Sequence, residues 1–434
     1  MRLRRYGTFA GGIDLPAEKH ATGDSPVRAA PVPESLKVPL APCRARPAEL
    51  LVEPGQMVAA GQPIARPRDG TQVPVFAPLA GRVGPVVTVQ VADWAGFAPR
   101  PALEILDPSA PELPEPAEGD WADLSPQQLR DALAEAGVTT HRRQPRPLAR
   151  WIDSAIDAGV RTLIANGLEA QPYVTSDHRV LAEFGRETIE GLALIAAAME
   201  VQDLVLGVDA RHTDGYRELI PLTRPFGIKR MALPRKYPTG NDTILIKVLT
   251  GREVPVGGRP FDVGVAVVGI PTCLAAYRAV AGGAPPLGRV VTVSGERVEQ
   301  PGNVWVPWGY DCAELLGPLE PPLIHGGPMN GLVVRPGSVV TAATEALLAI
   351  ASPPHEPAKP CIRCGWCTDH CPARLNVAAL NDAFELGEAD RGANVGADAC
   401  VECGICSYVC PARLPLSQRV KTLKQVLAAR RRQP

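Results

Sequence analysis

Two cysteine runs near the C-terminal end constrain this chain of 434 residues more than any other feature. The first run has Cys361, Cys364, Cys367 and Cys371 before Pro372, and the second has Cys400, Cys403, Cys406 and Cys410 before Pro411. Each run reads C-x2-C-x2-C-x3-C-P. Three thiolates at this spacing can wrap one corner of a metal–sulfur cube, and the proline ends the loop. The runs therefore predict a pair of metal-binding loops.

The spacing is that of two 4Fe-4S clusters, in which the fourth cysteine of each run ligates the other cluster. Cluster 1 then uses Cys361, Cys364, Cys367 and Cys410, and cluster 2 uses Cys400, Cys403, Cys406 and Cys371. Paired C-x2-C motifs also build zinc sites, and this alternative stays open. Disulfides are disfavoured, because the remaining Cys43, Cys273 and Cys312 are scattered and odd in number. The pattern predicts a protein that moves electrons.

Composition limits the partners and the compartment. The formal net charge of −1 gives no reason to expect nucleic acid as a partner. No apolar stretch follows the basic N-terminal residues, and no apolar run reaches the roughly 18 residues that a membrane span needs. We therefore expect a cytoplasmic protein, either soluble or peripheral on the cytoplasmic face of the inner membrane.

The C-terminal residues predict a basic amphipathic helix. Its apolar positions are Val420, Leu423, Val426 and Leu427, and its cations are Arg419, Lys421, Lys424, Arg430, Arg431 and Arg432. Such a helix can rest on an anionic membrane surface or dock on a membrane-embedded protein. A solvated terminal helix with a basic tail is the alternative.

The pattern along the chain predicts a multidomain α/β protein. Short apolar strands broken by glycine turns, from Leu50 to Val87, resemble the barrel-sandwich hybrid of biotinyl and lipoyl carriers, without a lysine at the hairpin tip. Residues 1–98 form this unit, 99–120 a proline-rich linker, 121–285 an α/β domain, 286–345 a β-grasp-like module and 350–434 the dicluster domain.

Alternating helices and strands in the α/β domain predict a mostly parallel sheet. Expected strands are Thr162–Asn166, Asp203–Val208, Met231–Leu233 and Asp262–Val268, and expected helices are Thr188–Gln202, Asp242–Thr250 and one that begins at Ser125. Pockets in such sheets form beyond the carboxyl ends of the strands. The loops that start at Asn166 and Arg235 lie at such ends.

Seven motifs, in order through nearly the whole chain, resemble those of the RnfC family, a soluble component of the Rnf/Rsx ion-translocating electron-transport complex. They are Gly11–Pro16, Asn166–Asp177, Lys236–Gly240, Leu249–Pro255, the SLBB-like stretch from Val291 to Asn303, Gly326–Met329 and the two cluster runs taken together.

The resemblance implies an α/β domain similar to the flavoprotein component of respiratory complex I. It implies FMN, reduced by NADH, which feeds electrons to the clusters. Asn166 and Glu169 are then the surviving residues of a flavin pocket. The implied partners are the membrane subunits of an Rnf-like complex.

The chain departs from the family pattern in the flavin and NADH region. The family has a glycine-rich loop here, which lets backbone amides approach a phosphate. This chain has Gly137–Leu148, with one glycine and with Arg142, Arg143 and Arg146, which could hold a phosphate by charge. This chain also differs from the family at two residue pairs that include an acidic position in the family. These pairs are Ala170-Gln171 and Asn241-Asp242 in this chain. These changes argue against direct oxidation of NADH.

Three functions stay open. We expect an electron-transfer subunit of an Rnf-like oxidoreductase complex that relays electrons through two 4Fe-4S clusters. The alternatives are an FMN-dependent subunit that oxidises NADH, and a catalytically dead scaffold with structural metal sites.

Overall fold

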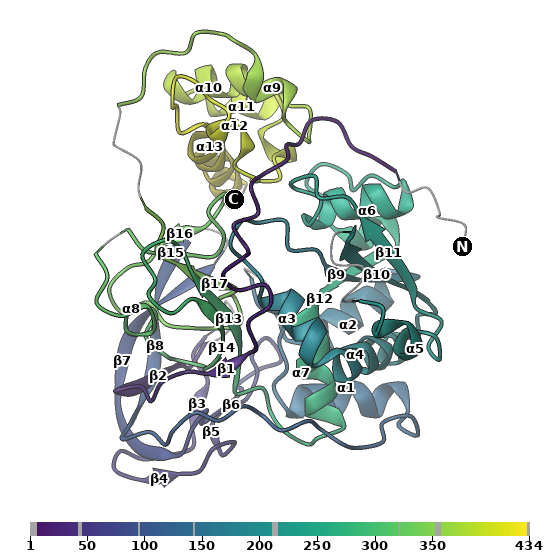
Figure 1. Cartoon of the computed structure of the whole chain (residues 1–434), viewed down its shortest axis with the longest axis vertical. Coiled ribbons are helices and arrows are strands. Elements are labelled where there is room, and N and C mark those ends of the chain that lie inside the picture. The colour runs from purple at the N-terminus through teal and green to yellow at the C-terminus, as the bar shows by residue number, and fades with distance from the viewer. Residues whose placement is uncertain are drawn as a thin grey trace.

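The computed structural model describes residues 7–41, 46–93, 96–141, 144–210, 216–320, 322–351 and 357–431. Two sheet-bearing parts lie side by side, and a small helical C-terminal domain lies at one end (Figure 1). The N-terminal segment passes beside this domain and then runs between the two larger parts to β1 (Arg28–Ala29). Cys43, Arg142, Arg143 and Arg432, named above from the sequence, lie outside the described residues.

The first β-rich unit contains two small antiparallel sheets. One has the order β2-β8-β7-β4, with β2 at Ser35–Pro39, β4 at Met57–Val58, β7 at Gly81–Asp93 and β8 at Gly96–Leu106. The other joins β3 (Glu49–Leu50), β5 (Pro63–Arg66) and β6 (Val75–Phe76). Because β8 pairs with β2 and β7 as far as Leu106, the segment predicted as a linker from residue 99 begins inside a strand.

A six-stranded sheet with the order β1-β14-β13-β17-β15-β16 packs on this unit. Its strands are β13 (Gly288–Ser294), β14 (Gly302–Pro307), β15 (Ile324–His325), β16 (Leu332–Val333) and β17 (Ala346–Leu348), with α8 (Cys312–Leu316) between β14 and β15. Val291, Val304 and Leu347 share one core with Leu36 and Ile64 of the first unit. β17 pairs in parallel with β13, so the sheet extends beyond the predicted boundary at residue 345.

The α/β domain has a parallel sheet with the order β11-β10-β9-β12, as predicted. The strands are β9 (Thr162–Gly167), β10 (Asp203–Asp209), β11 (Lys229–Leu233) and β12 (Val265–Gly269). The helices are α1 (Pro126–Glu135), α2 (Leu148–Asp157), α3 (Ser176–Glu183), α4 (Gly185–Ala198), α5 (Leu219–Thr223), α6 (Asp242–Thr250) and α7 (Ile270–Val280).

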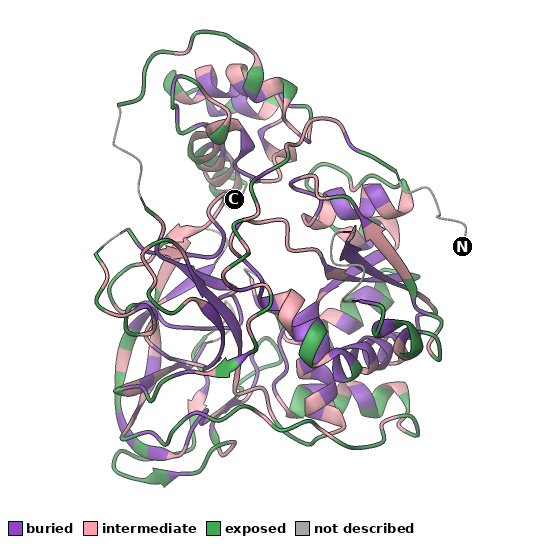
Figure 2. Cartoon of the chain, in the orientation of Figure 1, coloured by how far each residue is buried: buried purple, intermediate pink, exposed green. Residues whose placement is uncertain are grey.

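The helices cover both faces of the sheet, and successive side chains of each strand point to opposite faces. Leu163 of β9 faces the core formed with α1, α2, α4 and α7, and its neighbour Ile164 faces α6 on the other side. Figure 2 shows β9, β10, β12 and α4 as largely buried, whereas the edge strand β11 is mostly half-buried. This arrangement leaves the carboxyl ends of the strands open for a site.

The predicted helix ends were right where capping residues are present. Ser125 and Gln128 form a capping box at α1, and Asn241 caps α6, which ends at Gly251 with φ +74°. The expected strand from Asp262 was wrong at its start, because Pro260–Val263 form a 3-10 turn (η2) and β12 begins at Val265. The expected helix Thr188–Gln202 instead spans Gly185–Ala198.

The C-terminal domain consists of two similar halves at a constant offset of 39 residues, from Cys361 to Cys400. The first half has α9 (Trp366–Asp369) and α10 (Val377–Glu385), and the second has α12 (Ile405–Tyr408) and α13 (Leu416–Arg430). Between the halves lie α11 (Ala389–Asn394) and a 3-10 turn, η3 (Ala397–Ala399). The two helix pairs pack together around the cysteines.

Helix α13 uses its apolar side within the domain. Val420, Leu423 and Leu427 are buried in the domain core, whereas Val426 is partly exposed. Four of its predicted cations form ion pairs inside the domain: Arg419 with Glu385, Lys424 with Glu402, Arg430 with Asp390 and Arg431 with Asp398. Three of the four predicted apolar positions therefore pack inside the domain. In the part of the chain that the structure describes, no helix has the length and apolarity that crossing a bilayer requires.

Candidate functional site

The cysteines predicted to hold cluster 2 come together across the two halves of the domain. Cys371 lies with Cys400, Cys403 and Cys406 around one small cavity. Burial, together with the neighbouring Cys400 and Cys371, raises the pKa of the Cys403 thiol to about 12. The pKa of Cys406 is also raised, by burial and then by Cys400, Cys403 and Cys371. The fourth cysteine of the first run thus sits where the second run needs a ligand.

The cysteines predicted for cluster 1 show the reciprocal arrangement. Burial raises the pKa of Cys367, and the nearby Cys364 and Cys410 add to this shift. Cys361 lies beside Arg363 in the same loop. The burial of the four positions differs from that of cluster 2 at two places: Cys364 is exposed whereas its counterpart Cys403 is buried, and Cys367 is buried whereas its counterpart Cys406 is half-buried.

The donor set fits iron–sulfur clusters. Backbone N–H groups point at the thiols, as from Leu375 to Cys371 Sγ and from Glu402 to Cys400 Sγ, both at 3.4 Å. Such hydrogen bonds to sulfur tune the potential of a cluster. Among the described residues, no three His, Cys, Asp or Glu side chains converge as ligands of a single ion. A cubane takes one thiolate at each of its four irons.

A pocket of about 580 Å³ lies at the carboxyl end of the parallel sheet, as the sequence predicted. Its walls come from the end of β9, the loop before α6, the N-terminus of α7 and the loop before α2. Its size is in the range of pockets that hold cofactors. Cys403 and Val401 of the cluster-2 loop form part of its wall. Cys403, a predicted ligand of cluster 2, therefore also lines the pocket.

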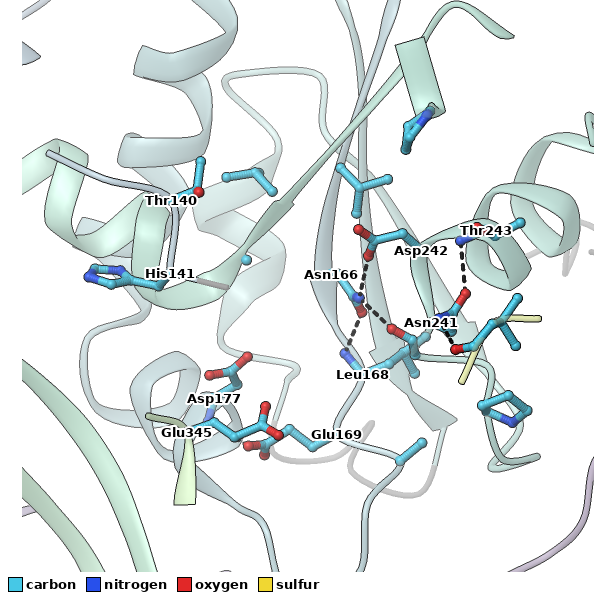
Figure 3. A pocket seen from close by; sticks show the side chains of 18 of the residues that line it. Thr140, His141, Asn166, Leu168, Glu169, Asp177, Asn241, Asp242, Thr243 and Glu345 are labelled. Carbon is cyan, nitrogen blue, oxygen red and sulfur yellow. Dashed lines mark hydrogen bonds between the residues drawn. The ribbon is translucent and has the colours of Figure 1, made fainter. Parts of the chain in front are cut away.

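Asn166 and Glu169, the two predicted flavin-pocket residues, both line this pocket. Figure 3 shows Asn166 beside Asn241 and Asp242, and Glu169 facing Asp177 and Glu345. The Asn166 amide donates to the Gly240 carbonyl at 2.9 Å and thereby joins β9 to the loop before α6.

Glu169 binds the N-terminus of α3 through its carboxylate. Its carboxylate accepts hydrogen bonds from the backbone N–H groups of Asp177 at 2.8 Å and His178 at 2.9 Å. These are donors that the first turn of a helix leaves unpaired. The acidic positions lost from the family motifs do not leave the pocket without acids, since Asp177, Asp242 and Glu345 also line it.

The glycine-poor loop carries a histidine whose burial the sequence did not indicate. His141 is 8% exposed, and neither ring nitrogen has a hydrogen-bond partner in the described structure. Burial and the Arg289 charge lower its pKa to about 3, and the Pro271 carbonyl opposes this weakly. A neutral imidazole therefore stands at the pocket wall where the family has glycines. Arg146 lines the same pocket, and its side chain is exposed.

Three hydrogen bonds connect segments around the pocket and the two cysteine runs, and the first of them joins the pocket to the cluster-2 loop. The Tyr237 phenol donates to the Cys403 carbonyl, the Gly12 N–H donates to the His370 carbonyl at 2.9 Å, and Gln171 accepts from the Met329 N–H at 3.2 Å. All three segments lie in motifs that carried the family resemblance. The motifs singled out these residues in the sequence. Their contacts depend on the tertiary structure, so the sequence did not reveal their role.

Comparison with known proteins agrees with this arrangement. Residues 7–99 match the RnfC barrel sandwich hybrid domain. Over 404 residues the chain is 33% identical to the RnfC protein of the ion-translocating oxidoreductase complex of Rhodobacter capsulatus, covering 90% of this chain and 77% of that protein.

The chain belongs to the RnfC family of ion-translocating oxidoreductase complexes.

The RnfC protein of the same complex from Edwardsiella ictaluri is 33% identical over 393 residues. This alignment covers 86% of the present chain, which spans only 48% of that relative. Residues 134–278 match the Nuo51 FMN-binding domain, and residues 358–414 match the 4Fe-4S dicluster domain. A solved NAD+-reducing [NiFe]-hydrogenase is 16% identical with a TM-score of 0.48, covering 71% of this chain and 62% of that chain.

The dicluster match settles the choice between cluster and zinc. The cofactors of this RnfC homologue are two 4Fe-4S clusters, and the FMN-binding-domain match is consistent with an additional FMN. The predicted fold is confirmed in its three main parts: the barrel-sandwich hybrid, the complex-I-flavoprotein-like domain and the dicluster domain.

Proposed function

We propose that this chain relays electrons between the pocket of its α/β domain and a partner subunit of an Rnf-like complex. The observation that carries the proposal is the position of Cys403, which lines the pocket and is a predicted ligand of cluster 2. Cys364, a predicted ligand of cluster 1, is exposed. The eight cysteines thus extend from a pocket wall to the surface.

A 4Fe-4S cluster gains and loses single electrons when bound. The chain's own residues supply position and environment. The buried thiols of Cys403 and Cys406 have raised pKa values without metal, so their binding as thiolates depends on the charge of iron. Backbone N–H groups stabilise the charge on sulfur. The partners on this proposal are membrane subunits of the complex, and the chain itself is peripheral on the cytoplasmic face of the membrane.

A second candidate function is electron entry from NADH through FMN. The pocket of about 580 Å³ and the FMN-binding-domain match favour it. Asn166 would then bind and orient the flavin, and Glu169 would hold α3 in place. The loop from Gly137 to Leu148 argues against it, because bulky His141 stands where close backbone approach to a phosphate would need glycine. A dead scaffold is not favoured, because all eight cluster cysteines are present.

An anaerobic absorbance spectrum of the purified chain tests both candidates. We expect iron–sulfur absorbance that dithionite bleaches and NADH leaves unchanged. Flavin absorbance together with bleaching by NADH would establish the second candidate instead. The variants Cys364→Ala and Cys403→Ala each remove a predicted ligand and should abolish electron delivery to the partner subunits. Delivery at the wild-type rate after loss of a cluster would contradict the relay.

A further inference from the structure

The two halves of the dicluster domain present equivalent faces with different surroundings. At the offset of 39 residues, Ile362 corresponds to Val401, Cys364 to Cys403, Gly365 to Gly404 and Trp366 to Ile405. We call residues 362–366 the free face and residues 401–405 the docked face. Gly365 and Gly404 have the same φ of +83°, and α9 and α12 begin directly after them. The local backbone of the two faces is therefore the same.

The docked face shows how this backbone receives a partner. Ile405 is 0% exposed, in a cluster with Leu15 and Tyr237. Tyr237 donates a hydrogen bond of 2.6 Å to the Cys403 carbonyl. The Met329 carbonyl lies so close to Gly404 that a Cβ there would overlap it. The interface thus consists of an apolar contact, one donor to the ligand cysteine's carbonyl, and a backbone packed on glycine.

The free face offers the same features to solvent. Ile362 is 66% exposed and Trp366 is 53% exposed, although large apolar side chains are usually covered. A Cβ on Gly365 would meet only the Asp369 carboxylate, at 3.8 Å, among the described atoms. The exposed ligand Cys364 lies between these residues.

We propose that the free face docks a second redox protein in the way that the docked face binds this chain's own pocket domain. The partner contributes an apolar side chain against Ile362 and Trp366, and a hydroxyl or N–H donor to the Cys364 carbonyl. Its own redox centre lies behind that contact, as the pocket lies behind the docked face. Cys361, Cys364, Cys367 and Cys410 would hold cluster 1 beside this contact, and the cluster would supply single-electron exchange with that centre without a bond being formed or broken.

Charge adds a preference to this surface. Lys359 is exposed, and a backbone hydrogen bond holds it to Ala412 beside cluster 1. The nearby Arg363 is already paired with Asp382. An acidic rim on the partner would therefore associate faster, and added salt would slow the association. The inference rests on the proposed function, because it names the partner's side of the same relay.

Binding to membranes tests the docking separately from electron transfer. The probe is a membrane preparation of the source organism that retains the other subunits of the complex and lacks this chain. Purified holo-chain is titrated onto it as wild type, Ile362→Asp, Trp366→Asp and the control Met57→Asp. Met57 is 66% exposed, like Ile362, but lies in the N-terminal β-rich unit. We expect the first two substitutions to weaken binding by about tenfold or more, as for buried interface anchors, and the control to bind as wild type.

Each outcome decides a different point. Unchanged binding by Ile362→Asp and Trp366→Asp, with intact cluster absorbance, would overturn the docking inference and leave the relay standing. If these variants lose cluster absorbance, Ile362→Ser and Trp366→Ser replace them under the same criterion. A wild-type dimer in sedimentation that Ile362→Asp dissociates would assign the face to self-association and overturn the inference. Clusters that dithionite cannot reduce would refute the relay, and the binding ratios would still report on docking.

Discussion

The phenol of Tyr237 donates a hydrogen bond of 2.6 Å to the backbone carbonyl of Cys403. Tyr237 is 3% exposed and lines the pocket of the α/β domain, so the bond is shielded from water. The same tyrosine exchanges backbone hydrogen bonds with Ile13 of the N-terminal segment. A single side chain therefore joins the pocket wall, the N-terminal segment and the loop of cluster 2.

Replacing Tyr237 with phenylalanine should destabilise this junction. Tyr237→Phe leaves the buried Cys403 carbonyl without this donor, which costs about 1–3 kcal/mol. We expect a lower free energy of unfolding and a changed electron paramagnetic resonance signal of reduced cluster 2. Tyr310→Phe is the control, because Tyr310 donates to the Pro31 carbonyl at 3.3 Å in a different core. An identical cluster signal in Tyr237→Phe would show that this bond does not affect the cluster environment.

Gly11 should tolerate no side chain, because the backbone at Cys371 lies very close to it. Gly11 has φ +64°, and a Cβ there would lie 2.6 Å from the Cys371 carbonyl oxygen. Gly159 has φ +66° with nothing within 4 Å of the added Cβ. Gly159→Ala therefore costs only the left-handed backbone, about 1–2 kcal/mol. Gly11→Ala should cost clearly more and disturb a predicted cluster-2 ligand.

Thermal unfolding and iron content of the two alanine variants check this difference. Equal stability loss in Gly11→Ala and Gly159→Ala would contradict a tight passage of the N-terminal segment over Cys371. Loss of bound iron only in Gly11→Ala would show that the segment supports the cluster as well as the fold.

Local chemistry made much of this fold predictable from the sequence. The cysteine spacing is set within a single loop, so the metal-binding loops could be recognised from the sequence. The helix caps Ser125 and Asn241 act within one turn and could be recognised for the same reason. The start of β12 could not, because Pro260 and the left-handed Gly264 form a turn inside an otherwise apolar run. Nor could the addition of β17 to the six-stranded sheet, which depends on pairing with a distant strand.

The site was predictable to a similar extent. Asn166 and Glu169 were placed at the correct end of the sheet, because parallel strands end at one edge. Their engagement with Gly240 and with α3 requires knowledge of segments far along the chain. The burial of His141 beside Arg289 likewise follows from packing between domains, and its sequence neighbours gave no sign of it.

His141 should make stability depend on pH. Its folded pKa of about 3 lies below the unfolded value of about 6.5, so above pH 6.5 the ring is neutral in both states and the full stability is present. As the pH falls from 6.5 toward 3, the unfolded state binds a proton that the folded state excludes, and stability is lost. Between pH 7 and 5.5 this amounts to about 1 kcal/mol.

Urea unfolding at pH 7 and 5.5 measures this effect. His141→Gln cannot titrate, and it should reduce the stability difference between the two pH values by about that 1 kcal/mol. Groups other than His141 contribute equally to both proteins. An unchanged difference in His141→Gln would mean that the His141 ring takes up a proton in the folded chain as readily as in the unfolded one.

The crossed ligand sets can be tested by pairs of cysteine substitutions. Two clusters bind about eight irons, so Cys371→Ala and Cys400→Ala should each leave about four. If both cysteines serve cluster 2, the double variant also leaves about four, because the second change removes nothing further. Cys371→Ala combined with Cys361→Ala should instead remove both clusters. Cys312→Ala, at a buried cysteine in α8, is the control that should retain all iron. Uncrossed ligation predicts the reverse pattern for the two double variants, so iron analysis of these chains decides which cysteine completes each cluster.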